Sequence, residues 1–147
     1  MNRRWIWSVA FALYGALMLW LLFDRVGYDP GVPYPEQLKF NLVPLHTIRL
    51  FWDALQSHTY RTAAVVNLGG NVIMFIPLGF LLPRVFPRLE KWWKVLAAAI
   101  GIVTAVELVQ LVTLLGTCDI DDLILNLLGA IMGYSIHSLL TKKSLSK

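Results

Sequence analysis

Carboxylate and amide side chains interrupt the apolar segments of this sequence at regular spacing. Asp119, Asp121 and Asp122 occupy three of four consecutive positions at the mouth of an apolar run, and Asn126 follows one helical turn after Asp122. Glu107 lies inside the preceding apolar run. Such groups can exchange protons, hold a cation through their oxygens, or form hydrogen bonds to a bound polar molecule. Any of these roles requires elements that bring the groups together.

The composition indicates that lipid surrounds these elements. Of the 147 residues, 57 % are hydrophobic and only 15 % are charged, whereas soluble domains usually contain about 25 % charged residues. The single cysteine, Cys118, excludes a disulfide within the chain. No Cys/His cluster has metal-ligand spacing, so we predict no metal site and no cofactor. No basic stretch with interleaved aromatic residues points to nucleic acid.

Four apolar stretches are long enough to cross a bilayer, which takes roughly 20 residues of helix. We therefore predict an all-α membrane protein with one domain over residues 1–147, and with spans at about 5–23, 63–83, 92–115 and 119–140. The first stretch begins after basic residues, as a signal peptide does. Its apolar run exceeds the usual signal-peptide core of about 7–15 residues, and no small-residue cleavage pattern follows, so we interpret it as an uncleaved span.

The distribution of basic residues predicts the orientation in the membrane. Lysine and arginine gather before the first span, in the 84–94 loop and in the C-terminal tail. The long 24–62 loop also holds basic residues, but acidic residues accompany them. By the positive-inside rule, both termini are expected to be cytoplasmic and the 24–62 loop to face outward.

The outer loop is expected to contain one short helix. Its first part is rich in proline and glycine and should be irregular. After Pro44, apolar residues recur at helical spacing (Leu45, Ile48, Trp52 and Leu55), while Arg49, Asp53 and Gln56 take the opposite face. This pattern predicts an amphipathic helix that lies at the outer membrane surface or packs over the bundle as a lid.

Three of the predicted spans place polar residues at one depth. With about 1.5 Å of rise per residue, these side chains lie roughly 5–12 Å below the outer ends of their spans. Spacings of three or four residues also put them on single helix faces. We expect them to form an outer-leaflet polar pocket made of Asn67, Asn71, Glu107, Gln110, Asp122 and Asn126.

The aspartates at the start of the last span are expected to differ in role. Asp119 and Asp122 should cap the helix, because a helix N-terminus favours anions. Asp121 lies off their face and is expected to be solvated. The asparagines could act only as packing contacts between helices. A carboxyl group at the depth of Glu107 is poorly explained by packing and favours a function.

Four motifs together resemble the VanZ-like family of bacterial membrane proteins. They are "NLVPLHTI" (41–48), "NLGGNVIMFIPLGFLLP" (67–83), "ELVQL" (107–111) and "CDIDDLILNLLGAIMGY" (118–134). The resemblance implies a multi-pass protein of the bacterial cytoplasmic membrane and cell envelope. The name-giving member is associated with resistance to the glycopeptide antibiotic teicoplanin. Many members carry an arginine shortly before the first aspartate of the last motif, and Gly116 occupies that position here.

These observations leave three functions open. In the first, the polar pocket binds a lipid head group, a lipid-linked envelope precursor or an amphiphilic antibiotic, and so contributes to glycopeptide resistance. In the second, the protein is an intramembrane enzyme acting on a lipid-linked substrate, with Glu107, Asp119 and Asp122 as the candidate catalytic residues; the two aspartates could then hold a divalent cation. In the third, the protein is a small ion- or proton-coupled transporter. The sequence does not indicate an oligomeric state.

Overall fold

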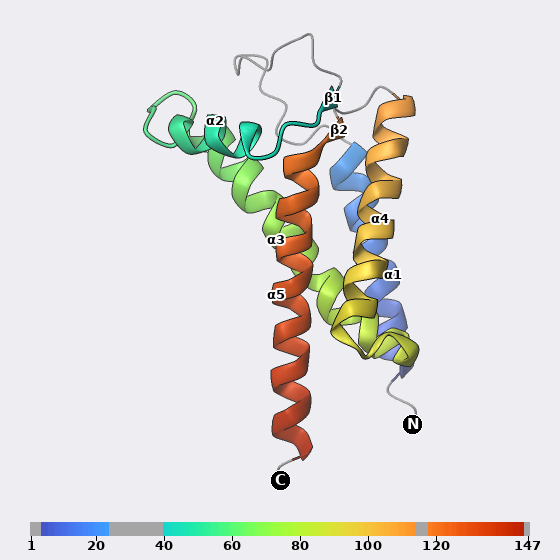
Figure 1. The fold of residues 1–147 in the computed structure, drawn as a ribbon. Coiled ribbons are helices and arrows are strands. Elements are labelled where there is room, and N and C mark those ends of the chain that lie inside the picture. Colours follow the sequence, from blue (N-terminus) through green and yellow to red (C-terminus); the bar gives the residue numbers. More distant parts are fainter. Residues whose placement is uncertain (1–3, 24–39, 114–117, 146–147) are drawn as a thin grey trace.

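Four long helices and one short helix make up nearly all of the protein. The structure, a computed structural model, describes residues 4–23, 40–113 and 118–145. The long helices are α1 (Arg4–Phe23), α3 (Arg61–Val85), α4 (Trp92–Thr113) and α5 (Ile120–Leu145). The short helix α2 (His46–Ala54), the 3-10 turn η1 (Pro87–Leu89) and two strands of two residues, β1 (Phe40–Asn41) and β2 (Cys118–Asp119), complete the described elements. Figure 1 shows this arrangement.

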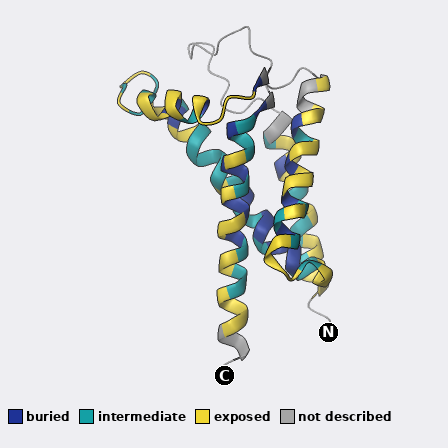
Figure 2. Ribbon diagram, viewed as in Figure 1, coloured by how far each residue is buried: buried dark blue, intermediate teal, exposed yellow. Residues whose placement is uncertain are grey.

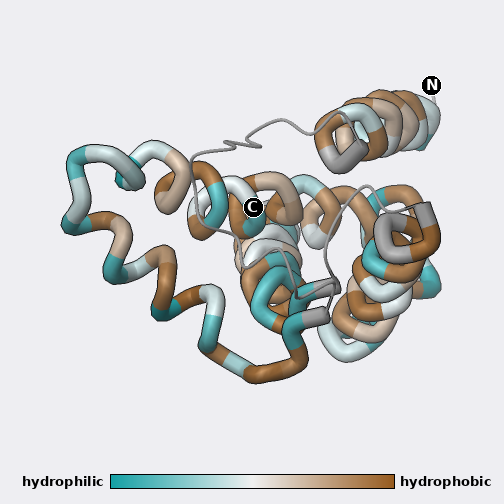
Figure 3. The backbone as a smooth tube through the Cα atoms, turned by 90° about the horizontal axis from the view of Figure 1, so that it is seen from above, coloured by the Kyte–Doolittle hydropathy of each residue, from teal (hydrophilic) through white to brown (hydrophobic). Residues whose placement is uncertain are grey.

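Each of the four long helices is long and apolar enough to cross a membrane. Their large apolar side chains remain on the outside of the bundle, as the exposed residues in Figure 2 and the hydrophobic segments in Figure 3 show. Outward-facing apolar side chains are expected where lipid rather than water is the solvent. The predicted all-α membrane fold with four spans is therefore confirmed. The last two residues of the predicted 92–115 span lie outside the described residues.

The tightest packing in the bundle joins α3 to α5. At Gly129 and Gly133 of α5, an added Cβ would lie 2.1 Å from the Val72 carbonyl oxygen and 1.9 Å from that of Ile76. Only glycine lets the two backbones approach this closely, and small residues four positions apart are typical of contacts between membrane helices. The apolar core beside this contact contains Met18, Phe75, Leu78, Leu82, Val95, Ala99, Val103 and Ala130.

The other long helices assemble around α3 and α5. Although α1 and α4 overlap in Figure 1, the view from above separates them, and α1 packs on α3. The Tyr14 hydroxyl of α1 donates a hydrogen bond of 2.9 Å to the Met74 carbonyl oxygen of α3. α4 packs mainly along α5. Because α3, α4 and α5 all pack against one another, the polar residues on their facing sides lie in one shared interior.

The predicted short helix after Pro44 is α2, which lies across the end of the bundle where α5 begins (Figure 1). Its buried face is different from the predicted one. Thr47 and Phe51 are buried, whereas Trp52, which was assigned to the apolar face, is 64 % exposed. The difference arises because a polar residue, Thr47, faces the bundle. Its hydroxyl donates a hydrogen bond to Asp119, which lies 72 positions away in the sequence.

Two short strands attach α2 to the start of α5. β1 and β2 pair in parallel, with Phe40 opposite Cys118 and Asn41 opposite Asp119. This pairing places the chain before α2 directly beside the chain before α5. The segments that carry the first and last of the four sequence motifs thus meet at one end of the bundle.

Candidate polar binding site

Asp119 joins three separate parts of the chain at the start of α5. Its Oδ1 accepts a hydrogen bond of 2.8 Å from the Asp121 backbone N–H, so Asp119 caps α5 as predicted. The same oxygen accepts a bond of 3.2 Å from Asn41 Nδ2, and Oδ2 accepts one of 2.6 Å from the Thr47 hydroxyl. Asn41 Nδ2 also lies 2.8 Å from Thr47 Oγ1. Both oxygens of Asp119 are thus occupied by donors from the protein.

Asp121 caps the other helix, α2, across the interface. Its Oδ1 accepts a bond of 2.6 Å from the Leu45 N–H, and its Oδ2 accepts one of 3.0 Å from the Ile48 N–H. Leu45 is the N-cap residue of α2 and has a left-handed backbone, with φ of 65°. Leucine has no side-chain oxygen to cap the helix, so a carboxylate 76 residues away satisfies the free N–H groups. The prediction that Asp121 is solvated is wrong, because it is 0 % exposed.

Asp122 links α5 to α3. Its Oδ1 accepts a hydrogen bond of 2.6 Å from Asn71 Nδ2. The carboxyl groups of Glu107, Asp119 and Asp121 lie close enough to act electrostatically on Asp122. The depth argument from the sequence placed Asn71, Glu107 and Asp122 in one layer, and the structure brings them together.

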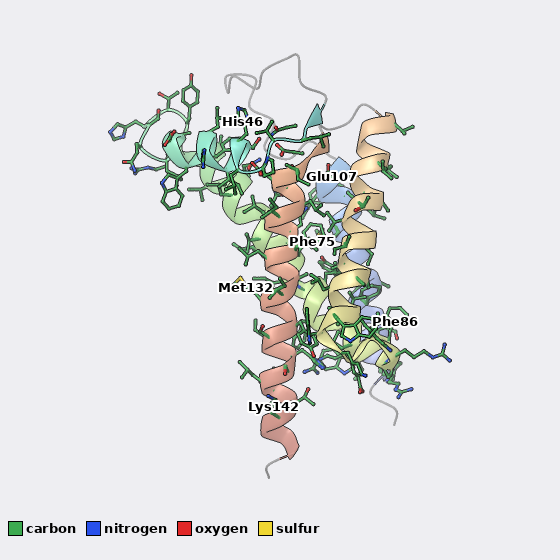
Figure 4. All side chains as sticks on the ribbon, in the orientation of Figure 1. His46, Phe75, Phe86, Glu107, Met132 and Lys142 are labelled. Carbon is green, nitrogen blue, oxygen red and sulfur yellow. The ribbon has the colours of Figure 1, made fainter. Side chains whose placement is uncertain are left out.

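Glu107 and Asn126 retain buried oxygens that the protein leaves unused. Glu107 is 8 % exposed and accepts a hydrogen bond from the Asp119 backbone N–H. Its Oε2 is buried and has no hydrogen-bond partner among the described residues. Asn126 is 4 % exposed, and within the same part of the chain its Oδ1 is also buried without a partner. Figure 4 shows Glu107 in the half of the bundle nearer the start of α5, far from Lys142. Buried polar atoms are nearly always paired with protein or with a bound molecule.

Comparison with known proteins places these residues in a known family. The VanZ/LLP1 family matches residues 11–141. The chain belongs to the VanZ-like family. It is 28 % identical over 135 residues to Protein VanZ of Enterococcus faecium, an alignment that covers 89 % of this chain and 73 % of that protein. No solved structure matches the chain. The family match contains every residue of the site described above.

The remaining predicted pocket residues of this VanZ-like protein lie nearby along the same helices. Asn67 precedes Asn71 by one turn of α3 and is partly buried. Gln110 follows Glu107 by one turn of α4, but its side chain lies outside the described residues. The structure brings together Asn71, Glu107, Asp119 and Asp122, and Asn126 follows Asp122 by one turn of α5. We call these five residues the polar cluster.

Sequence reasoning missed three residues that support this cluster: Asn41, Thr47 and Asp121. Asn41 and Thr47 both lie in the "NLVPLHTI" motif on which the VanZ-like resemblance partly rests. The polar residues within that motif could therefore have indicated a hydrogen-bonded contact. Its partner could not be found from spacing, because Thr47 and Asp119 are 72 positions apart.

Hydrogen bonds hold the described residues of the polar cluster together. Within the described residues, no group of three or more His, Cys, Asp or Glu side chains is arranged to hold a metal ion. Asp119 and Asp121 use both of their oxygens to hold the protein together. Two buried acceptors of the cluster, Glu107 Oε2 and Asn126 Oδ1, have no partner among the described residues and are left for a ligand. Both would suit a hydroxyl, an amide N–H or an ammonium group.

Proposed function

We propose that this VanZ-like protein binds an amphiphilic molecule of the cell envelope, with the polar part of that molecule at the polar cluster. The observation that carries the proposal is the pair of buried oxygens, one on Glu107 and one on Asn126, that have no partner among the described residues. A buried oxygen without a partner destabilises the protein by roughly 1–3 kcal/mol. A ligand that donates hydrogen bonds to these oxygens would remove that penalty.

An apolar groove supports an amphiphilic ligand rather than a purely polar one. The groove, about 170 Å³ in volume, lies between α4 and α5 and is lined by Trp92, Val95, Leu96, Ala130, Ile131 and Tyr134. Ala130 follows Asn126 by one helical turn. A single alkyl chain could therefore extend along the groove while the head group contacts Asn126. Lipid head groups, lipid-linked precursors and acylated glycopeptide antibiotics share this chemistry.

The first test is the Asn126→Leu variant. Leucine has the branched outline of asparagine, with two methyl groups in place of the amide oxygen and nitrogen, and it removes the oxygen that has no partner among the described residues, so the variant should still fold. Loss of the head-group contact should at the same time reduce the amount of amphiphile that copurifies with the full chain after gentle detergent extraction. Mass spectrometry of the bound lipid and a thermal unfolding curve measure both effects.

Thr141→Leu serves as the matched control. Thr141 is an exposed residue near the other end of α5, and its hydroxyl donates a hydrogen bond to the His137 carbonyl oxygen of the same helix. The control should retain the parent amount of bound amphiphile. If Asn126→Leu retains as much as Thr141→Leu does, the polar cluster is not the binding site. A marked loss of stability in Asn126→Leu would instead make Asn126 a structural contact.

A second test separates the classes of ligand. Teicoplanin and its deacylated form can each be added to the purified protein while the unfolding temperature is recorded. An acylated antibiotic ligand should raise that temperature only when the acyl chain is present. If both forms raise the unfolding temperature equally, the groove does not bind the acyl chain.

A further inference from the structure

A second unpaired polar group lies at the opposite end of the bundle, where α1 begins and η1 follows α3. Arg84 is the penultimate residue of α3. Its guanidinium carbon lies 4.3 Å from the ring centroid of Trp7 and 4.3 Å from that of Phe80. The two rings meet edge to face, with centroids 6.1 Å apart and an interplanar angle of 76°. They form a corner that holds the guanidinium by cation–π attraction.

One donor of Arg84 is left unused among the described residues. A guanidinium has five N–H donors in one plane, and contact with aromatic rings employs none of them. Arg84 Nε is buried without a hydrogen-bond partner among the described residues. The guanidinium is thus held in place with a donor that a ligand can use.

His137 adds a second nitrogen to the same place. Its ring packs edge to face against Phe80, with centroids 6.3 Å apart, and it lies close enough to feel the charge of Arg84. His137 Nδ1 is also buried without a partner in the described residues. Arg84, His137, Trp7 and Phe80 together are called the Arg84 corner below.

The surroundings of the Arg84 corner match the boundary between lipid tails and head groups. Trp5, Trp92 and Trp93 are exposed near the same ends of α1 and α4. Tryptophan side chains exposed near the ends of spans are typical of this boundary. Arg88 and Lys91 are exposed in the segment that follows α3 and add positive charge there. Anions near the membrane surface are therefore attracted toward Arg84.

We propose that the Arg84 corner binds the phosphate of an anionic membrane lipid. A phosphate offers the paired oxygens that the planar N–H fork of arginine recognises, and its negative charge is opposite to that of the guanidinium. The aromatic rings fix the guanidinium before binding, so little side-chain freedom is lost. The site is independent of the polar cluster, which lies near the other end of α3 and has no described cation.

Native mass spectrometry of the full chain in detergent tests this site with two probes, dioleoyl phosphatidylglycerol and dioleoyl phosphatidylcholine. The parent protein should retain the anionic lipid in preference to the zwitterionic one. Arg84→Gln should lose that preference, with affinity for phosphatidylglycerol falling at least about tenfold. Arg88→Gln, which makes the same change of charge at an exposed site on η1, should stay within about twofold of the parent protein.

Two further measurements keep the proposal falsifiable. Arg84→Lys retains the charge but lacks the planar fork, so it should bind phosphatidylglycerol more weakly than the parent even if Arg84→Gln does not fold. Inorganic phosphate, titrated into the delipidated protein, tests whether the Arg84 corner binds a free anion instead of a lipid. The proposal is overturned if both lipids bind equally, if Arg84→Lys matches the parent, or if phosphate displaces phosphatidylglycerol at equal concentration.

Discussion

Three aspartates in four positions perform three different tasks. Asp119 caps its own helix and binds Asn41 and Thr47, Asp121 caps α2, and Asp122 binds Asn71 of α3. The start of α5 therefore holds together β1, α2 and α3. Consecutive positions at a helix start point in different directions, which explains why adjacent acidic residues can serve separate partners.

Asp121→Asn should destabilise the attachment of α2. An amide has one oxygen instead of two, so it cannot accept hydrogen bonds from both Leu45 and Ile48, and the buried NH₂ group would face an N–H. The expected loss is roughly 1–3 kcal/mol. Hydrogen exchange at the Leu45 and Ile48 amides should accelerate, which mass spectrometry of peptides from residues 42–50 would detect.

The control for this prediction is Asp53→Asn, which changes an exposed acidic residue near the end of α2. It should leave both stability and exchange within about 0.5 kcal/mol of the parent protein. Equal exchange in the two variants would show that the carboxylate of Asp121 is not needed to cap α2.

At Glu107, two substitutions separate binding from proton or cation chemistry. Glu107→Gln keeps the shape of the side chain and an oxygen that can accept the Asp119 N–H bond. It should fold like the parent protein. The amide NH₂ that replaces Oε2 can donate to a ligand hydroxyl, which accepts as well as donates, so a site that only binds such a group should retain much of the bound amphiphile. Glu107→Leu should lose that amphiphile. Copurified lipid and the unfolding temperature are the measurements.

An enzyme or transporter would respond differently to the same pair. Reactions that require proton release or cation binding at Glu107 would be lost in both variants. If both variants match the parent in stability and in bound amphiphile, Glu107 has no function and the polar cluster must be redrawn without it.

Among the helices, the contact between α3 and α5 sets the positions of the polar residues. The glycines of α5 let its backbone approach α3, and that approach is consistent with the short bond between Asn71 and Asp122. Gly133→Ala would place a Cβ 1.9 Å from the Ile76 carbonyl oxygen and 2.9 Å from the Phe80 nitrogen. Because both neighbours are backbone atoms, the helices must separate, and we expect a lower unfolding temperature.

Gly101→Ala is the matched control for this contact. Gly101 lies inside α4, and an added Cβ there would meet nothing within 4 Å. Alanine favours a helix over glycine by about 1 kcal/mol in helix interiors. Gly101→Ala should therefore unfold at the same temperature as the parent or above it. A similar decrease in both variants would contradict a role for close α3–α5 packing.

A feature could be predicted from the sequence where the residues that determine it lie close together in the chain. Apolar runs predicted the four spans, and helical rise predicted that Asn71 and Asp122 share a depth, because both signals lie within single helices. The buried face of α2 could not be predicted, since Thr47 is held by Asp119 and not by apolar neighbours. The Arg84 corner was also missed, because its four residues come from three helices.

The whole molecule has chemically opposite ends. The end where α5 begins gathers carboxylates and amides, whereas the end where α1 begins carries Arg84 and the basic segment after α3. Four helices that each cross the membrane once must return the chain to the side on which it started. The charge asymmetry then predicts that the basic end is cytoplasmic.

Cysteine labelling in cells tests this orientation. In a Cys118→Ser background, Glu90→Cys introduces a thiol beside η1, and His58→Cys introduces one between α2 and α3; both positions are exposed. Glu90→Cys adds no negative charge to the basic segment, so it should not disturb the signal that sets the orientation. A membrane-impermeant maleimide should label His58→Cys in intact cells and Glu90→Cys only after the cells are opened. The Cys118→Ser protein alone should remain unlabelled. Labelling of Glu90→Cys from outside would place the polar cluster in the inner leaflet, and an envelope ligand approaching from outside would then be excluded.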